Sequence, residues 1–281
     1  MRKFKPRTWS RILSSLVAVY PFQRGRTRLR SITGKWLVGR LPFGPWVRVS
    51  GVVDAEWDFL MNKVKEDATT EFVKSFLRPG MTFVDVGANV GYFTLLAASL
   101  GASVVAYEPT PAVVERLREN IALSGFDSVT VVNAAVADKR GTLHLYQSPN
   151  DPEANNLFGD GDDPVKVRAV SLDDDLADHG VQKVDLLKID AEGAEPLVLI
   201  GAARLLRSTS APTIIIEVNP VSLRSANSVP AAVLSSLESS GYRCSELERV
   251  MYKGETVVNY LATPVNMLVT PVLGLQDFPM L

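Results

Sequence analysis

A short glycine-rich segment, Asp85–Gly91 (DVGANVG), follows a run of apolar residues and precedes a helical pattern. Glycines in such a turn let the backbone bend tightly and approach a ligand, and free N–H groups at the start of the following helix can point toward that ligand. Glu108 stands at the end of the next predicted strand, where a carboxylate can accept hydrogen bonds from both hydroxyls of a ribose. Together these residues predict a site for a cofactor that contains adenosine.

Two such cofactors compete for this site, a dinucleotide and S-adenosylmethionine. The dinucleotide fingerprint is Gly-x-Gly-x-x-Gly, whereas here three residues separate Gly87 from Gly91 and Asp85 stands just before them. A carboxylate at that place would repel a pyrophosphate, but it suits the amino end of a cationic cofactor without phosphate. The charge favours S-adenosylmethionine, with the turn at its methionine end, Glu108 at its ribose and residues 133–135 along its adenine. The residues expected to contact it are Asp85, Gly87, Ala88, Asn89, Gly91, Glu108, Pro109, Asn133, Ala134, Ala135 and Asp190.

Acidic residues follow a later predicted strand, residues 184–189. Ligands of open parallel sheets bind outside the carboxyl ends of the strands. We therefore expect Asp190, Glu192 and Glu195 to be candidate catalytic groups, with one serving as general base for a substrate hydroxyl or several orienting it. A solvated acidic loop is the alternative, since surface carboxylates are common.

Glu217 and Asn219 end the neighbouring predicted strand, residues 213–218, and should reach the same edge of the sheet. Together with Asp190 they could hold Mg²⁺, because this cation prefers oxygen ligands, and the metal would lower the pKa of a substrate hydroxyl. Carboxylates placed for hydrogen bonding would leave the same pattern, so both interpretations stay open. His144 is a further candidate catalytic group, because it alternates with apolar neighbours on a predicted strand and histidine titrates near neutral pH.

Strand and helix patterns alternate regularly after Pro79-Gly80, which is typical of a parallel sheet wrapped by helices. Gly141 indicates a hairpin that joins 135–136 to 143–146, and the polar residues 147–164 predict a long loop of functional importance. Before Pro79 we expect a lead-in element over 47–65 and a helix over 68–77. The remaining predicted elements are strands 82–86, 103–107, 129–132, 165–170, 184–189, 213–218, near Tyr242, 256–261 and 265–270, and helices 91–100, 111–124 and 231–240.

Several of these segments together resemble the FkbM family of methyltransferases. The most specific element is Lys188–Glu195 (KIDAEGAE), which an ordinary nucleotide-binding sheet has no folding reason to contain. The resemblance covers about residues 66–270. The segments that carry it are FVDVGANVGYFTLLAA at 83–98, Glu108-Pro109, REN at 118–120, NAAVAD at 133–138, VSLDD at 170–174, LLKIDAEGAEPLVLIGA at 186–202 and IIIEVNP at 214–220.

This resemblance implies an S-adenosylmethionine-dependent O-methyltransferase that acts on a hydroxyl of a sugar, glycolipid or polyketide-like acceptor, and not on nucleic acid. The implied fold is α/β, a Rossmann-like class I methyltransferase fold with a mostly parallel seven-stranded sheet, helices on both faces and an antiparallel C-terminal strand. Asp190 follows the predicted strand 184–189, and Glu217 and Asn219 end the predicted strand 213–218. This arrangement also resembles the metal site of catechol-type methyltransferases. We expect an N-terminal extension over 1–46, a lead-in over 47–78 and the S-adenosylmethionine-binding domain over 79–281.

The front of the chain is basic, because residues 1–53 contain Lys and Arg but no Asp or Glu, although the formal net charge of the chain is -1. Apolar residues recur at helical spacing within 8–20, which predicts an amphipathic helix. We expect residues 1–34 to contact an anionic membrane, or this helix to cap the main domain. The pattern has neither a run of ~18 apolar residues nor a signal-peptide cleavage site, so a cytoplasmic, membrane-peripheral protein is expected. A membrane-bound scaffold with the same fold is the alternative function, and the pattern does not specify an oligomeric state.

Overall fold

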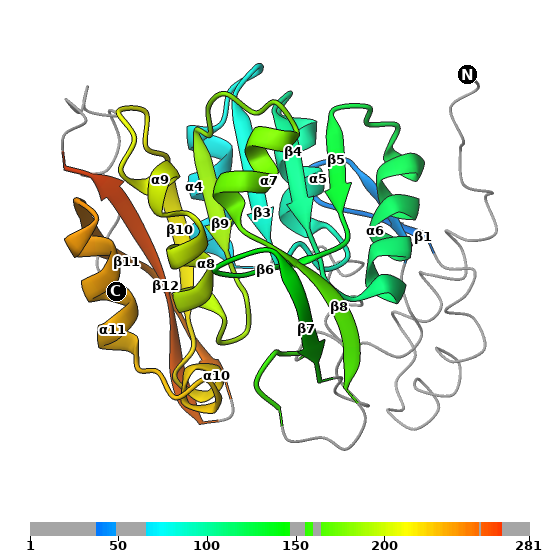
Figure 1. Ribbon diagram of the computed structural model, residues 1–281. Coiled ribbons are helices and arrows are strands. Elements are labelled where there is room, and N and C mark those ends of the chain that lie inside the picture. Colours follow the sequence, from blue (N-terminus) through cyan, green and yellow to red (C-terminus); the bar gives the residue numbers. More distant parts are fainter. Residues whose placement is uncertain (1–37, 49–65, 147–154, 160–163, 253, 266–281) are drawn as a thin grey trace.

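A seven-stranded sheet forms the centre of the molecule in the computed structural model, which describes residues 38–48, 66–146, 155–159, 164–252 and 254–265 (Figure 1). The strand order is β11-β12-β10-β9-β3-β4-β5. Five neighbouring strands are parallel, whereas β12 runs antiparallel to β10 and β11 runs antiparallel to β12. The strands are β3 (Thr82–Val86), β4 (Ser103–Tyr107), β5 (Val129–Val132), β9 (Leu186–Ile189), β10 (Thr213–Val218), β11 (Tyr242–Tyr252) and β12 (Glu255–Pro264).

This strand order is that of the Rossmann-like class I methyltransferase fold, which confirms the predicted fold class. The chain runs outward from β3 through β4 to β5 and then returns to β9, which lies on the other side of β3. The strand order therefore reverses between β3 and β9. In open α/β sheets, ligands bind outside the carboxyl ends of the strands at such a reversal.

Alternate residues of the central strands point to opposite faces of the sheet, and each face is covered by its own helices. Phe83 and Val104 belong to a buried cluster with residues of α4, α5 and α6, whereas Val84 and Val105 belong to a second cluster with residues of α7 to α11. Burial on both faces explains why these strands read as continuous apolar runs. The helices are α4 (Asp67–Phe76), α5 (Tyr92–Ser99), α6 (Pro111–Ser124), α7 (Leu172–Asp178), α8 (Glu195–Gly201), α9 (Ala203–Leu206), α10 (Pro220–Ser225) and α11 (Pro230–Ser239).

A separate three-stranded sheet corrects one prediction. Its strands are β6 (Ala135–Val136), β7 (Gly141–Leu145) and β8 (Val165–Val170), in the order β6-β8-β7. The expected hairpin between β6 and β7 is wrong, because β8 lies between them and pairs parallel with β6 and antiparallel with β7. Gly141 is the first residue of β7 and not a turn residue. The later strand β8, remote in sequence, decides this pairing.

Two short strands near the front of the chain, β1 (Val38–Arg40) and β2 (Trp46–Arg48), form an antiparallel ribbon that packs on α6. The N–H of Trp46 donates to the Ser124 hydroxyl at 3.0 Å, and the N–H of Arg48 donates to Asn120 Oδ1 at 2.8 Å. The expected boundary at residues 46 and 47 falls inside this ribbon. The helix predicted over 8–20 lies outside the described residues, as does most of the strand predicted over 265–270. None of the described helices has the length and apolar character that crossing a bilayer requires.

Candidate active site

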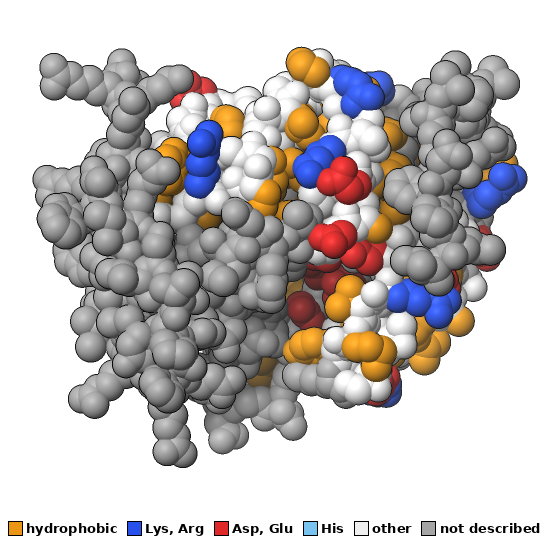
Figure 2. All heavy atoms as spheres, turned by 180° about the vertical axis from the view of Figure 1, so that it is seen from behind, with side chains coloured by type: hydrophobic (Ala, Val, Ile, Leu, Met, Phe, Trp, Pro, Cys, Tyr) orange, Lys and Arg blue, Asp and Glu red, His pale blue; other side chains and the backbone are white. Residues whose placement is uncertain are grey.

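A cavity of about 550 Å³ opens at the carboxyl ends of β3, β4, β9 and β10, at the reversal in strand order. The start of α4, the segment 155–157 and the β11–β12 hairpin complete its wall. Figure 2 shows acidic side chains gathered in and around a hollow near the middle of the face seen from behind. The location agrees with the edge at which the sequence predicted both the cofactor and the catalytic groups.

The glycine turn brings β3 against the loop that follows β9. Gly87 has a φ of +79°, and a Cβ placed on it would lie 1.8 Å from the carbonyl oxygen of Asp190, so no larger residue fits without moving that loop. The N–H groups of Gly87 and Ala88 both donate to the carbonyl oxygen of Tyr107 at 3.0 Å. These two groups hold the turn to β4. Gly91 lies outside the cavity wall and begins α5 with a φ of +100°.

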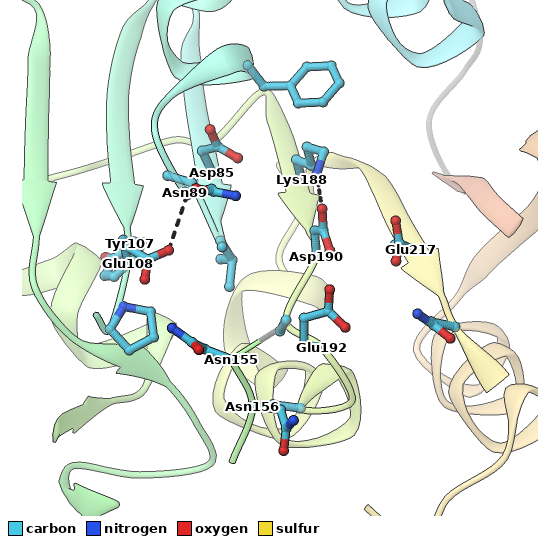
Figure 3. Close-up of a pocket in the computed structure, with 18 of the residues that line it drawn as sticks. Asp85, Asn89, Tyr107, Glu108, Asn155, Asn156, Lys188, Asp190, Glu192 and Glu217 are labelled. Atoms are coloured by element: carbon cyan, nitrogen blue, oxygen red, sulfur yellow. Dashed lines mark hydrogen bonds and ion pairs between the residues drawn. The ribbon is translucent and has the colours of Figure 1, made fainter. Parts of the chain in front are cut away.

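Glu108 lies in the cavity wall at the end of β4 and is only 7% exposed. Its Oε2 accepts from the N–H of Asn89 at 3.2 Å, and its Oε1 accepts from the N–H of Thr110 at 2.8 Å. Burial raises the pKa of this carboxyl, although these two hydrogen bonds partly oppose that rise. The backbone thus fixes the orientation of the carboxylate at the edge of the cavity (Figure 3).

The position of Asn133 differs from the sequence prediction, because this residue is outside the cavity wall. Its Nδ2 donates to the carbonyl oxygens of Glu108 and Pro109, both at 2.9 Å. It therefore holds the loop after β4 in place and does not line the cavity. The residues that follow it, Ala134 and Ala135, do line the cavity together with Pro109.

Lys188 was not predicted as a site residue, yet it is the buried cation of the cavity. Its side chain is 3% exposed, its Nζ lies 2.9 Å from Asp190 Oδ2, and the same Nζ lies 4.8 Å from the centroid of the Phe93 ring. Burial alone would lower the pKa of this amine, but the surrounding carboxylates, Asp190 first among them, raise it above its ordinary value. Residues two apart on a strand share a face, so the spacing of Lys188 and Asp190 was a signal for this pair.

Asp85 occupies the neighbouring position on β3, because it is paired in register with Lys188. Its side chain is 1% exposed, and its Oδ2 accepts from the hydroxyl of Thr94 at 2.7 Å. Asp85 lines the cavity. Its place at the methionine end of a cofactor stays a prediction. Its contact with Thr94 also joins the carboxyl end of β3 to α5.

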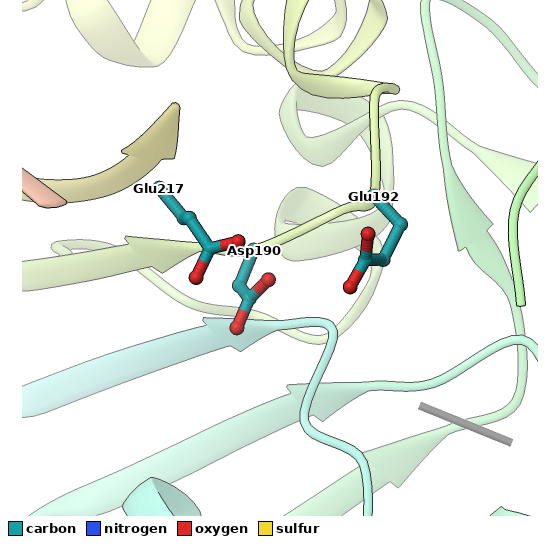
Figure 4. Close-up of side chains that lie close together, drawn as sticks. All are labelled: Asp190, Glu192 and Glu217. Carbon is teal, nitrogen blue, oxygen red and sulfur yellow. The ribbon is translucent and has the colours of Figure 1, made fainter. Parts of the chain in front are cut away.

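Three carboxylates from two strand ends meet in the cavity. One oxygen each from Asp190, Glu192 and Glu217 lie within 4.8 Å of one another, and the close-up in Figure 4 shows the three side chains around a common space. The hydroxyl of Ser222 donates to Glu192 Oε2 at 2.8 Å. Burial, and then the charges of Asp190 and Glu192, raise the pKa of Glu217 well above its ordinary value. Of the predicted catalytic groups, the structure brings Asp190 and Glu192 together here.

Asn219 caps a helix. It lines the cavity, but its Oδ1 accepts from the N–H groups of Val221 at 3.0 Å and Ser222 at 3.4 Å and so caps α10. The predicted metal set of Asp190, Glu217 and Asn219 therefore has one oxygen already engaged.

Glu195 lies beneath the cavity and not in its wall. Its Oε1 accepts from the N–H groups of Ala191 at 3.0 Å and Gly193 at 3.2 Å, while its Oε2 is buried without a hydrogen-bond partner. Between those two N–H groups stands Glu192, which has a φ of +48°. Burial raises the pKa of Glu195 to about 7. Glu195 thus braces the turn that carries Glu192.

His144 is not brought to the site. It is exposed on β7, where it pairs with Lys166, whereas its neighbour Leu145 is buried and lines the cavity. Side chains alternate between the two faces of a strand, so a wall that contains Leu145 leaves His144 on the other face.

The start of α4 and the β11–β12 hairpin supply wall residues that the sequence reasoning missed. Glu248 follows a bulge in β11, and its carboxylate accepts from the N–H of Thr69 at 3.2 Å and from the Thr69 hydroxyl at 2.9 Å. Asn259 Nδ2 donates to Glu66 Oε2 at 3.1 Å. These contacts join residues 179 and 193 positions apart in the chain, so only tertiary structure could reveal them.

The chain is similar to known methyltransferases over this region. Methyltransferase sdnD of Sordaria araneosa is 32% identical over 152 residues, which cover 42% of this chain and 59% of that protein. The 2-O-methyltransferase NoeI of Sinorhizobium fredii is 25% identical over 158 residues, with 50% of this chain and 64% of that protein covered. The 31-O-demethyl-FK506 methyltransferase FkbM of Streptomyces tacrolimicus is 30% identical over 195 residues, with 58% and 74% covered. The chain thus spans about three fifths of the length of the first two relatives.

A family model described as the methyltransferase FkbM domain matches residues 85–244. The match begins at the carboxylate before the glycine turn and includes both Glu108 and the segment KIDAEGAE. It covers more than half of the chain, and it contains most of the cavity wall described above. By this match and by its strand order, the chain belongs to the family of FkbM methyltransferase domains.

Proposed function

We propose that this protein transfers the methyl group of S-adenosylmethionine to a hydroxyl oxygen of a small-molecule acceptor such as a sugar or a polyketide. One observation carries the proposal: a single cavity contains both Glu108 and the three carboxylates Asp190, Glu192 and Glu217. A cofactor held near Glu108 and an acceptor held near the carboxylates would share that space. Two of the relatives are named for transfer to oxygen, which supports a hydroxyl acceptor.

The cavity residues fit this cofactor. Each carboxylate oxygen of Glu108 accepts one backbone N–H, which leaves acceptor capacity on both oxygens for the two ribose hydroxyls. Asp85 offers a carboxylate near the glycine turn, where the cationic amino end would lie. Apolar side chains next to Pro109 suit the flat adenine ring. They are Ala134, Ala135, Val136 and Leu145.

The bound cofactor supplies an activated methyl group and its leaving group, so the chain needs to provide proximity, alignment and removal of the acceptor proton. The carboxylates of Asp190, Glu192 and Glu217 are able to orient a hydroxyl and to receive its proton. The ammonium of Lys188 lies 2.9 Å from Asp190 at their edge. The aromatic side chains of Phe93 and Tyr252 lie in the same wall.

A divalent cation is the other use of such a cluster, because one oxygen each from Asp190, Glu192 and Glu217 lie within 4.8 Å of one another. Two contacts near the cluster weigh against a cation. The side-chain oxygen of Asn219, the third predicted ligand, already accepts a hydrogen bond at the start of α10, and the ammonium of Lys188 balances the charge of Asp190. We therefore assign the cluster to hydrogen bonding and proton transfer. Turnover by protein treated with a chelator and returned to metal-free buffer should match that of untreated protein.

The test is release of S-adenosylhomocysteine by the full chain, measured with neutral glycosides, polyketide lactones and glycolipid extracts as acceptors. Calorimetric titration with S-adenosylmethionine runs in parallel. We expect saturable cofactor binding, and turnover that requires one acceptor class. Cofactor binding without turnover on any hydroxyl acceptor would contradict O-methyl transfer and would favour a binding or scaffold role for the fold.

A further inference from the structure

Glu217 stands at the centre of the acceptor end of the cavity. Parallel pairing of Ile216 with Ile189 puts it beside Asp190 at the ends of β10 and β9. It lines the cavity, and one of its carboxylate oxygens lies within 4.8 Å of an oxygen of Asp190 and of Glu192 (Figure 4). Three acids from neighbouring chain segments thus surround one small space.

The other two acids of the cluster are held by neighbouring side chains. Asp190 is 2.9 Å from the ammonium of Lys188, and Glu192 accepts a hydrogen bond from the Ser222 hydroxyl at 2.8 Å. Glu217 makes no hydrogen bond or ion pair with another residue in the described part of the chain. Both of its oxygens therefore keep their full acceptor capacity for a ligand in the cavity.

The charges that act most on Glu217 come from β9, from the loop that follows it and from the start of α4, whereas its partner on β12 is the neutral Asn259. Asp190, Glu192 and Glu66 are acidic, and Lys188 is the one cation among the charged residues that act on it most. Burial and these carboxylates favour the protonated form of Glu217, so its pKa lies well above the ordinary value. A carboxylate of raised pKa is a stronger proton acceptor than an ordinary one.

We propose that Glu217 is the catalytic base that takes the proton of the acceptor hydroxyl, while Asp190 and Glu192, held by Lys188 and Ser222, position that hydroxyl. This assignment rests on the proposed function. The O–H bond breaks toward the carboxylate of Glu217, and the electron pair left on oxygen forms the new O–CH₃ bond. The pair of the broken S–CH₃ bond stays on sulfur, so the cofactor leaves as a neutral thioether and Glu217 ends protonated.

The first test compares Glu217→Gln with the wild type and with Glu238→Gln, an exposed acid on α11 that serves as the matched control. We expect kcat of Glu217→Gln to fall by about 100-fold or more, with the dissociation constant of S-adenosylmethionine unchanged. Wild-type kcat should rise with pH through a limb above the ordinary glutamate range, and this limb should be absent from Glu217→Gln. A Glu217→Gln protein with wild-type kcat and an unchanged pH limb would overturn the assignment.

The second test uses the acidity of the acceptor. A phenolic and an aliphatic hydroxyl on otherwise similar acceptors differ in how much they need a base, so the kcat deficit of Glu217→Gln should shrink for the phenol. An equal deficit on both acceptors would indicate that Glu217 only positions the acceptor.

The third test is independent of turnover. Burial also raises the pKa of Glu108 and of Glu195. Carbon-13 NMR of glutamate carboxyls should therefore show several signals that titrate above the ordinary glutamate range, one of which disappears in Glu217→Gln. If the wild type lacks the signal that Glu217→Gln removes, the assignment of Glu217 is overturned. If the wild type has that signal but methylates no acceptor, the result counts against O-methyl transfer and not against the raised pKa of Glu217.

Discussion

Lys188 and Asp190 form a buried ion pair, with 2.9 Å between Nζ and Oδ2, at the point where the strand order of the sheet reverses. The pair places one cation beneath a cavity whose other charged wall residues are acidic. Because residues i and i+2 of an extended chain share a face, the KID segment positions both charges without help from another element.

Replacing Lys188 by Met should be strongly destabilising, because it leaves the Asp190 carboxylate without its counter-charge. We expect a loss of roughly 3 kcal/mol in the free energy of unfolding, the cost of removing one partner of a buried pair. Urea denaturation measures it. The double variant Lys188→Met with Asp190→Asn is the control, and it should recover most of the stability. If the double variant is as unstable as the single one, the loss comes from packing and not from charge.

Replacing Glu108 by Ala should weaken binding of S-adenosylmethionine by roughly 1.5–3 kcal/mol, the range for losing hydrogen bonds to a charged group. Calorimetric titration measures the dissociation constant. Glu115→Ala, an exposed acid on α6, is the matched control and should bind as the wild type does. An unchanged dissociation constant in Glu108→Ala would remove this residue from the ribose.

Replacing Gly87 by Ala should abolish cofactor binding and destabilise the fold. The new Cβ would lie 1.8 Å from the carbonyl oxygen of Asp190, so the loop after β9 must move. Gly125→Ala is the control, since Gly125 also has a positive φ, +73°, but a Cβ there meets nothing within 4 Å. The control should cost only about 1–2 kcal/mol for the backbone conformation. Equal thermal shifts for the two variants would show that close approach to Asp190 is unimportant.

Glu195→Gln should retain turnover, because its side-chain oxygen can still accept from the N–H groups of Ala191 and Gly193. Glu195→Ala removes that brace from Glu192, and kcat should fall by about tenfold to a hundredfold as the carboxylates shift. Steady-state kinetics of both variants measure this. If the two variants have the same kcat, the brace does not position Glu192.

Stability should also depend on pH through Glu195. Its folded-state pKa is raised from 4.5 to about 7, so the folded protein holds the proton more tightly than the unfolded chain. The resulting stabilisation is present below pH 4.5 and is lost as pH rises to about 7, a total of about 3 kcal/mol. Urea unfolding at pH 5 and pH 8 should show this loss in the wild type. The same loss in Glu195→Gln would assign it to another group.

The basic front of the chain should bind anionic surfaces. Each basic residue that reaches an anionic membrane contributes about 1 kcal/mol, and salt screens the attraction. Full-length protein should therefore sediment with anionic vesicles at low salt, be released as salt rises, and not bind neutral vesicles. A variant without residues 1–34 should stay in solution. If the full chain does not sediment with anionic vesicles at low salt, membrane contact is excluded as the role of this segment.

The sequence by itself determined the elements of the main sheet and the part of the cavity wall that contains Asp85 and Glu108. Strands buried on both faces read as apolar runs, and glycine turns and terminal carboxylates stand next to those runs in the chain, so Asp85 and Glu108 could be predicted. Local signals were sufficient because each of these groups is placed by the strand that it ends.

Only the tertiary structure decided which acids meet and which residues merely support them. Glu192 and Glu217 come together because β9 and β10 are neighbours, whereas Glu195 turns beneath the loop and His144 faces away. The wall from Glu66 and Glu248 depends on contacts between the start of α4 and the β11–β12 hairpin. Periodicity shows which face of its own element a residue occupies, but the packing of remote elements determines what lies opposite that face.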